Sequence, residues 1–98
     1  MTYKVIVRPE AEREIQEAFD WYEERDEGLG LEFLRAADAC LSTVQRNPAS
    51  SPIVHEQVRR ALLRKFPYAL FYLVREDTVV VLACFHAKRS PADWLRRS

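Results

Sequence analysis

The chain has 98 residues, enough for one domain with a single hydrophobic core, and residues 1–98 are treated as that domain. Apolar residues make up 48% of the chain and charged residues 31%, a composition that excludes a disordered polar chain. No apolar run approaches the roughly 20 residues that span a bilayer, and the start of the chain soon turns acidic, unlike a secretion leader, so we expect a cytoplasmic protein.

Charge is distributed unevenly, although the formal net charge is zero. Residues 1–50 carry 6 Lys/Arg and 11 Asp/Glu, whereas residues 51–98 carry 9 and 4. Zero net charge argues against direct binding of DNA by this chain. The asymmetry either indicates one anion-seeking face or arises only because acidic helices precede basic strands.

The first half of the chain predicts a strand and two helices. Side chains alternate over residues 2–8, which indicates a short strand. Apolar residues at helical spacing then predict a helix from about Pro9 to Arg25 and, after two glycines, a second helix that stops at Asn47-Pro48. The short link between the two favours an antiparallel helical hairpin.

The second half predicts three strands. A segment rich in proline and serine, residues 48–56, reads as a loop, and alternation resumes at Val58. Residues 68–74 and 78–85 are apolar on both faces, which predicts the inner strands of a hairpin that turns at Glu76-Asp77.

A two-residue turn in this hairpin fixes its register. It pairs Tyr72 with Val81 and Tyr68 with Phe85. The whole pattern predicts an α+β fold of two layers, with an N-terminal strand, an antiparallel helical hairpin and then a three-stranded antiparallel sheet. Because the inner strands are apolar on both faces and one helical hairpin covers only one of them, we expect a partner chain on the other.

One end of the predicted hairpin is rich in basic side chains. Five of them could converge on one rim: Arg64, Lys65, His86, Lys88 and Arg89. Such a rim could hold a phosphate or an acidic protein surface. In RNA cleavage, His86 would be the natural acid or base because it alone titrates near neutrality, but a lone histidine at a strand end is more often structural.

No cofactor or metal is predicted. The sequence has no His/Cys/Asp/Glu group at metal-ligand spacing and no glycine-rich loop for a nucleotide. Cys40 and Cys84 are too few for a disulfide framework and are expected to be buried thiols.

The C-terminal segment is a candidate interface. Residues 91–97 predict a short helix whose Trp94 either covers the core or, with Arg96 and Arg97 beside it, anchors a partner. The full set of candidate contacts with a target or partner is Lys65, Tyr72, Lys88, Trp94, Arg96 and Arg97.

Three stretches in this order resemble the ParE/RelE superfamily of type II toxin–antitoxin toxins, also called plasmid stabilisation proteins. They are Arg60 with Phe66-Pro67-Tyr68-x-Leu70-x-Tyr72, the strand 79–83, and His86-x-x-Arg89-x-Pro91-x-x-Trp94. The resemblance covers almost the whole chain. It implies a small cytoplasmic toxin that the flexible arm of a cognate antitoxin, encoded by a neighbouring gene, wraps in a hetero-oligomer.

The superfamily divides into two activities. RelE-like members cut mRNA on the ribosome, whereas ParE-like members lack a nuclease site and inhibit DNA gyrase. The nucleases place an arginine directly after the middle-strand tyrosine, where this chain has Ala69, and the positions of a second basic residue and a tyrosine hold Leu62 and Leu95. Arg60 and Arg89 match the nuclease pattern. Loss of a phosphate clamp typically costs about 3 kcal/mol of transition-state stabilisation, so the resemblance favours a ParE-like toxin.

Two alternatives stay open. Some nucleases of the superfamily use a C-terminal histidine, so a metal-independent endoribonuclease would use Arg60, Arg64, His86 and Arg89. A third possibility is a non-toxic module that only occupies its antitoxin, with DNA binding left to that partner.

Overall fold

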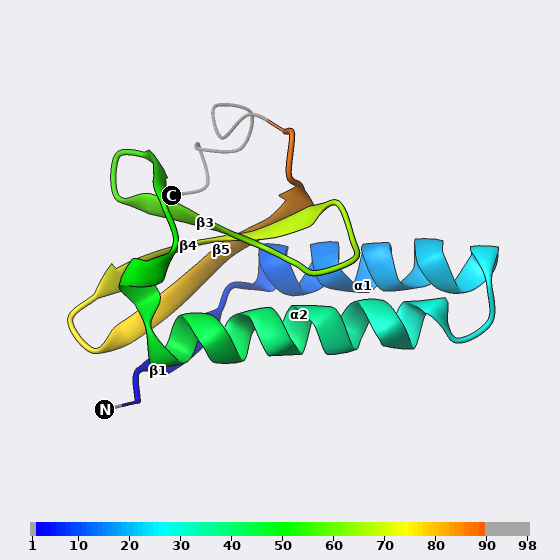
Figure 1. Ribbon diagram of the computed structural model, residues 1–98, viewed down its shortest axis with the longest axis horizontal. Coiled ribbons are helices and arrows are strands. Elements are labelled where there is room, and N and C mark those ends of the chain that lie inside the picture. The colour runs from blue at the N-terminus through cyan, green and yellow to red at the C-terminus, as the bar shows by residue number, and fades with distance from the viewer. Residues whose placement is uncertain (1, 90–98) are drawn as a thin grey trace.

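The computed structural model describes residues 2–89 and shows two helices packed along one face of a sheet (Figure 1). Its elements in chain order are β1 (Lys4–Val7), α1 (Pro9–Arg25), α2 (Leu29–Arg46), a 3-10 turn (Pro48–Ser50), β2 (Ile53–His55), β3 (Val58–Leu62), β4 (Tyr68–Arg75) and β5 (Thr78–His86). Within these residues, neither helix is long and apolar enough to cross a membrane.

The residues at both ends of helix α1 favour helix formation there. Pro9 occupies its first turn, where a missing N–H costs nothing, and Glu10 and Glu12 lie near the positive end of the helix dipole. Arg25 lies in the last turn, at the negative end. The predicted bounds of this helix are confirmed.

Helix α2 starts on a carboxylate that α1 supplies. The two side-chain oxygens of Glu23 accept hydrogen bonds from the backbone N–H groups of Gly28 and Gly30, each at 2.9 Å. Gly28 has a φ of 88°, in the left-handed region that favours glycine. A Cβ on Gly30 would lie 2.8 Å from the carbonyl oxygen of Phe19, so only glycine lets the helices approach this closely.

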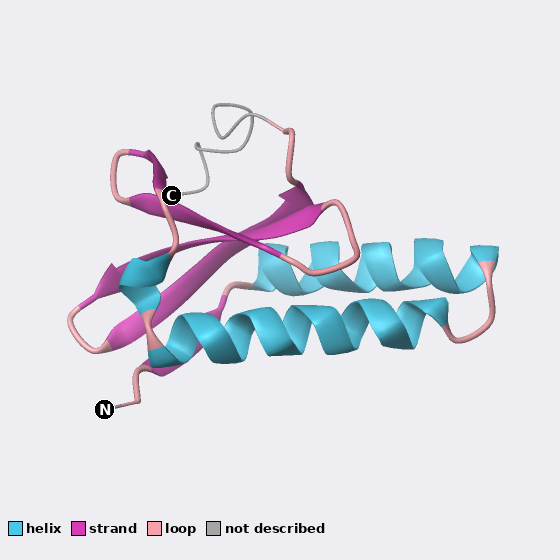
Figure 2. Ribbon diagram, in the orientation of Figure 1, coloured by secondary structure: helices cyan, strands magenta, loops and turns pink. Residues whose placement is uncertain are grey.

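The sheet has five strands in the order β1-β5-β4-β3-β2, and both helices cover one of its faces (Figure 2). Strand β1 is parallel to β5, and the remaining pairs are antiparallel. The predicted class, two-layer α+β, is confirmed. The sheet is larger than predicted because β1 joins it and because β2 forms within the segment predicted as a loop.

An extra residue in β5 shifts the hairpin register. Arg75 pairs with Thr78 across the predicted turn and Tyr72 pairs with Val81, but Phe71 pairs with Ala83, which leaves Leu82 as a bulge. Beyond it Tyr68 pairs with His86 instead of the predicted Phe85.

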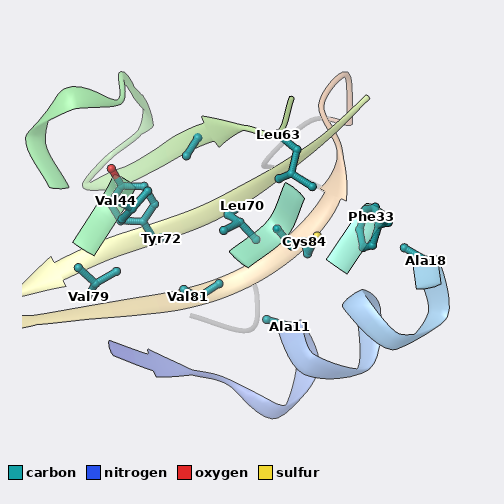
Figure 3. Packing of buried hydrophobic residues seen from close by; sticks show 12 residues of the cluster. Ala11, Ala18, Phe33, Val44, Leu63, Leu70, Tyr72, Val79, Val81 and Cys84 are labelled. Carbon is teal, nitrogen blue, oxygen red and sulfur yellow. The ribbon is translucent and has the colours of Figure 1, made fainter. Parts of the chain in front are cut away.

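The main core lies between the helices and the sheet (Figure 3). Phe33 from α2 and Leu70, Tyr72, Val79 and Val81 from the central strands are all at least 98% buried there. At one end Phe33 contacts an aromatic group with ring centroids 5.3 to 5.5 Å away, formed by Tyr22, Phe66 and Tyr68. Burial of this area is the main source of stability.

A second cluster of buried residues lies on the opposite face of the sheet, called here the outer face. It contains Val58, Ala69, Phe71, Leu73, Leu82, Ala83 and Phe85. The bulge places Leu82 and Ala83 in this cluster together, while Val81 and Cys84 on either side face the helices. The prediction of inner strands that are apolar on both faces is therefore confirmed.

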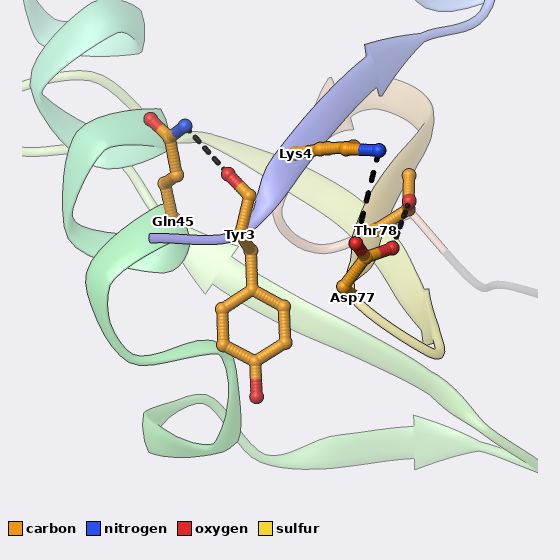
Figure 4. A network of polar contacts seen from close by, with 5 residues as sticks. All are labelled: Tyr3, Lys4, Gln45, Asp77 and Thr78. Atoms are coloured by element: carbon orange, nitrogen blue, oxygen red, sulfur yellow. Dashed lines mark hydrogen bonds and ion pairs between the residues drawn. The ribbon is translucent and has the colours of Figure 1, made fainter. Parts of the chain in front are cut away.

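The N-terminal strand is tied at both sides (Figure 4). The side-chain amide of Gln45 donates to the carbonyl oxygen of Tyr3 at 2.7 Å. The Lys4 backbone N–H donates to the Asp77 carbonyl at 2.8 Å, and the two side chains form an exposed ion pair at 3.8 Å. Strand β1 is thus held against both α2 and the β4–β5 turn.

Candidate functional site

Two grooves flank the sheet, one beside each helix. The first, called the α1 groove, has a volume of about 330 Å³ and lies where β4 begins and β5 ends. Its principal side chains are Glu14, Glu17 and Trp21 from α1, and Tyr68, His86 and Arg89. The second, called the α2 groove, has a volume of about 370 Å³, and its lining includes Cys40, Thr43 and Val44 from α2, together with Leu62 and Arg64.

The α1 groove combines carboxylates with a histidine and an arginine. Glu14 accepts a hydrogen bond from the backbone N–H of Cys84 at 3.0 Å, which fixes this carboxylate against β5. His86 accepts a hydrogen bond at Nδ1 from the Lys88 backbone N–H at 3.2 Å, so its Nε2 is the nitrogen available to a ligand. Two acidic side chains in the groove offset the positive charge that the sequence predicts there.

The two thiols are unsuited to nucleophilic chemistry. Burial raises the pKa of Cys40 to about 11. Burial, reinforced by the nearby charge of Glu14, raises the pKa of Cys84 to about 12. Since the thiolate is the reactive form, neither thiol is activated. Cys84 is buried, as predicted, whereas Cys40 is only half-buried and lines the α2 groove.

Two guanidinium groups contact the outer face: that of Arg60, and that of Arg89, which also lines the α1 groove. Arg60 on β3 donates from Nη1 to the Ala87 carbonyl at 3.4 Å, while its Nε is buried and makes no hydrogen bond within the described residues. The guanidinium of Arg89 lies 4.1 Å from the centroid of the Phe85 ring. Both cations therefore lie against apolar surface, which strengthens their interaction with any anion placed there.

The five basic residues predicted for one rim are distributed among separate places. Arg64 lines the α2 groove, and His86 and Arg89 line the α1 groove. Lys65, with a φ of 70°, makes the bend after β3, and Lys88 is exposed in the turn after β5.

The residues that an endoribonuclease would use are also separated in the structure. Tyr68 packs against the core beneath the helices, and His86 pairs with it, so His86 lies on the helix side of the sheet. Arg60 pairs with Phe71 and lies on the outer face. Ala69 is fully buried on the outer face, at the position where the nucleases carry an arginine.

Tyr72 is a structural residue, in contrast to its prediction as a partner contact. It is fully buried on the helix side, where its hydroxyl donates to the Pro48 carbonyl at 2.5 Å. The sequence pattern predicts that Tyr72 lies on an inner strand, but it does not indicate the carbonyl acceptor, which lies 24 residues away in the chain. Trp94, Leu95, Arg96 and Arg97 lie outside the described residues.

Glu14 and Glu17 are the site residues that the sequence did not identify. In the sequence they look like ordinary charged residues of a predicted helix. They reach the groove only because β1 pairs in parallel with β5 and lays α1 across the end of that strand. Among the described residues, no group of His, Cys, Asp or Glu could hold a metal ion.

Comparison with known proteins gives a family and a fold. The sequence model of the family described as "ParE toxin of type II toxin-antitoxin system, parDE" matches residues 5–91. A solved structure titled "Chromosomal ParDE TA system from P. aeruginosa" contains a chain that is 14% identical, with a TM-score of 0.74, over 87% of this chain and 96% of that chain. A likeness at this identity shows the fold. The curated proteins give no match.

Proposed function

This chain belongs to the ParE toxin family of type II toxin–antitoxin systems, and we propose that it arrests bacterial growth by binding DNA gyrase in the cytoplasm until a cognate antitoxin neutralises it. The observation that carries the choice of target is the division of the nuclease residues. A ribonuclease needs its base and its phosphate-binding cations around one phosphate. His86 and Arg60 lie on opposite faces of the sheet, and Ala69 replaces a cation.

Action by binding alone fits the remaining surface. Trp21 is 48% exposed on α1, and the guanidinium of Arg25 lies 3.5 Å from its ring centroid. Lys65 and Lys88 are exposed and remain candidate contacts with the target. Exposed tryptophan and arginine are the residue types that contribute most to protein interfaces.

Neutralisation by an antitoxin is supported by apolar side chains left open along the sheet. Ile6 on β1 and Ile53 on β2 are each 55% exposed, and Leu62 on β3 is 61% exposed. A partner that covers them would remove apolar surface from water and would stabilise the folded toxin by mass action.

One observation favours the nuclease alternative. Arg60 has an unpaired Nε on the outer face, and Arg89 lies against Phe85 of the same face, so two cations could hold a phosphate there. In that case His86, on the other side, would have to be replaced as acid or base by another group.

Induction of the chain alone in a bacterial host, followed by primer extension on a defined mRNA, separates these functions. We expect growth arrest with intact mRNA, and unchanged arrest in His86→Ala. Ribosome-dependent cuts that disappear in His86→Ala or Arg89→Ala would establish the nuclease instead. Normal growth with the folded chain present would show that the chain is a non-toxic module that only binds its antitoxin.

A further inference from the structure

Strand β5 continues past the end of its neighbour β1, and this last part of β5 lies in the α1 groove. Strand β1 pairs with residues 78–81 only, whereas β5 runs on to His86 beside helix α1 (Figure 1). The Cys84 backbone N–H points to the side where β1 has ended, and it donates to Glu14 of α1 at 3.0 Å. The helix thus supplies a partner for one backbone group of this edge.

Two further backbone groups of β5 are open on the same side. The Tyr68 carbonyl accepts the Leu63 N–H, so Tyr68 and His86 form a pair without hydrogen bonds between them. The Cys84 carbonyl and the His86 N–H therefore point away from β4, as the Cys84 N–H does. Within residues 2–89, neither group has a hydrogen-bond partner. The α1 groove therefore contains one unused acceptor and one unused donor.

The helix wall of the groove suits a guanidinium group. Glu14, Glu17 and Trp21 are three or four residues apart and project from one side of α1. Glu17 is exposed and makes no ion pair within the described residues. Trp21 is 48% exposed, and its ring already contacts one guanidinium, that of Arg25, which does not line the groove. A carboxylate beside an aromatic ring is the combination that binds guanidinium groups.

The strand wall of the groove suits a carboxylate. Arg89 is exposed and lines the groove after the end of β5. His86 accepts the Lys88 backbone N–H at Nδ1, so the neutral imidazole carries its proton on Nε2 and donates from there. The Arg89 guanidinium, this Nε2–H and the open backbone N–H of His86 are all donors for an anionic oxygen.

The charges of the groove decide the class of ligand. Its two carboxylates outnumber its one guanidinium, so a phosphate group, with its roughly two negative charges, would be repelled. A ligand with positive charge alone would leave Arg89 and the donors of His86 unused. A ligand that carries one carboxylate and an excess of positive charge matches both walls. The groove volume of about 330 Å³ lies within the range of small-ligand sites, about 300–1,000 Å³.

We propose that the α1 groove binds arginine with a free α-carboxylate, either as the amino acid or as the last residue of a polypeptide. The guanidinium lies between Glu17 and Trp21, where its planar shape suits both groups better than an ammonium does. The carboxylate lies at Arg89 and His86. The α-nitrogen, an ammonium in the amino acid and an amide N–H in a polypeptide, donates to the Cys84 carbonyl. This proposal does not depend on the proposed action on gyrase.

Titration of ligands into the ¹⁵N-labelled chain tests the site. L-arginine and the peptide Ac-Ala-Ala-Arg with a free C-terminal carboxylate are expected to shift the amide resonances of Glu17, Cys84 and His86 and the indole N–H of Trp21, and to leave β2 unaffected. L-citrulline, in which a neutral urea group replaces the guanidinium, and agmatine, which lacks the carboxylate, are expected to bind about tenfold or more weakly than L-arginine. No binding by either arginine ligand, or equal binding by L-citrulline or agmatine, would overturn the proposal.

The same titration distinguishes the two sources of the ligand. Binding of L-arginine that is as tight as that of the peptide, or tighter, assigns the site to the free amino acid. Tighter binding of the peptide assigns it to the C-terminal arginine of a polypeptide. The amide Ac-Ala-Ala-Arg-NH2, which has no carboxylate, should bind about tenfold or more weakly than the peptide acid in either case.

Matched variants test the assigned orientation from the protein side. Glu17→Gln is expected to weaken L-arginine binding by about tenfold or more, whereas Glu24→Gln, an exposed position of the same helix outside the groove, should leave it unchanged. Arg89→Gln should weaken binding of L-arginine but not of agmatine, because agmatine has no carboxylate for Arg89 to hold. Unchanged binding in folded Glu17→Gln, or equal weakening of both ligands by Arg89→Gln, would contradict the proposal.

Discussion

The carboxylate of Glu23 links the two helices, because both of its oxygens accept backbone N–H groups at the start of α2. These N–H groups have no partner within their own helix. Glu23 is one of four acidic residues between positions 23 and 27, and the other three, Glu24, Asp26 and Glu27, are exposed. Composition alone could not separate it from them.

Glu23→Ala is expected to lower the free energy of unfolding by about 1–2 kcal/mol, because two partly buried N–H groups lose their acceptor. Urea unfolding followed by circular dichroism measures the loss. Glu24→Ala, one position further along the same helix and exposed, is the control and should change stability by less than about 0.5 kcal/mol. Equal losses in the two variants would show that the cap contributes nothing.

Tyr72→Phe tests the structural role of the buried hydroxyl. The change leaves the Pro48 carbonyl without its donor, so we expect a loss of about 1–3 kcal/mol in urea unfolding. Growth arrest should persist at temperatures where the variant is folded. A variant of full stability that no longer arrests growth would instead restore Tyr72 as a contact residue.

The packing of α1 against α2 depends on two glycines for different reasons: Gly28 lies in the link between the helices, and Gly30 lies in the first turn of α2. Gly30 has no room for a Cβ because the Phe19 carbonyl and Glu23 lie against it, whereas Gly28 has space but a positive φ. The sequence locates both as helix breakers. It does not reveal that only Gly30 lies at a close helix contact.

Gly30→Ala is expected to destabilise the fold by about 1–3 kcal/mol, because the helices must separate. Gly28→Ala, which meets only backbone strain, should cost about 1 kcal/mol. Thermal unfolding of the two variants gives the ranking. A smaller loss of stability for Gly30→Ala than for Gly28→Ala would mean that the two helices can move apart at Gly30 with little loss of packing energy.

The features of the sheet that depend on the local sequence pattern were predicted correctly. Those that depend on pairing between distant segments were not. The hairpin turn followed from Glu76-Asp77 between two apolar runs, and the Tyr72–Val81 pair followed from that turn. The bulge at Leu82 left no signal, because every residue around it is apolar, and it moved Tyr68 opposite His86. Strand β2 is only three residues long and forms because β3 offers it a ladder.

The basic residues predicted for one rim are distributed between the two grooves and two exposed turns, and this distribution could not be predicted from the sequence. The hairpin register alone would gather the basic residues at one end, but α1 places Glu14 and Glu17 beside His86 and Arg89, while the bend at Lys65 turns Arg64 towards α2. Which helix lies beside which strand end is a tertiary property. This arrangement supports our proposal that the chain acts by binding and not as a ribonuclease.

Stability of the whole fold should fall in alkali because of Cys84. Its pKa is raised from 9.0 to about 12, so between these values the unfolded chain releases a proton that the folded chain keeps. Fewer protons bound in the unfolded state means that stability decreases as pH rises, by up to about 1.4 kcal/mol per pH unit. Urea unfolding from about pH 8 to pH 11 measures the slope, which should be shallower in Cys84→Ala; identical slopes would remove the thiol as the cause.

The most direct test of a toxin that acts by binding gyrase is a supercoiling assay with purified components. Relaxed plasmid, ATP and bacterial DNA gyrase are combined with increasing amounts of this chain. We predict that supercoiling decreases as the amount of chain increases, and that the His86→Ala variant inhibits gyrase equally well. Full supercoiling at a large molar excess of folded chain would contradict inhibition of gyrase. It would favour the alternative, an endoribonuclease that uses Arg60 and Arg89.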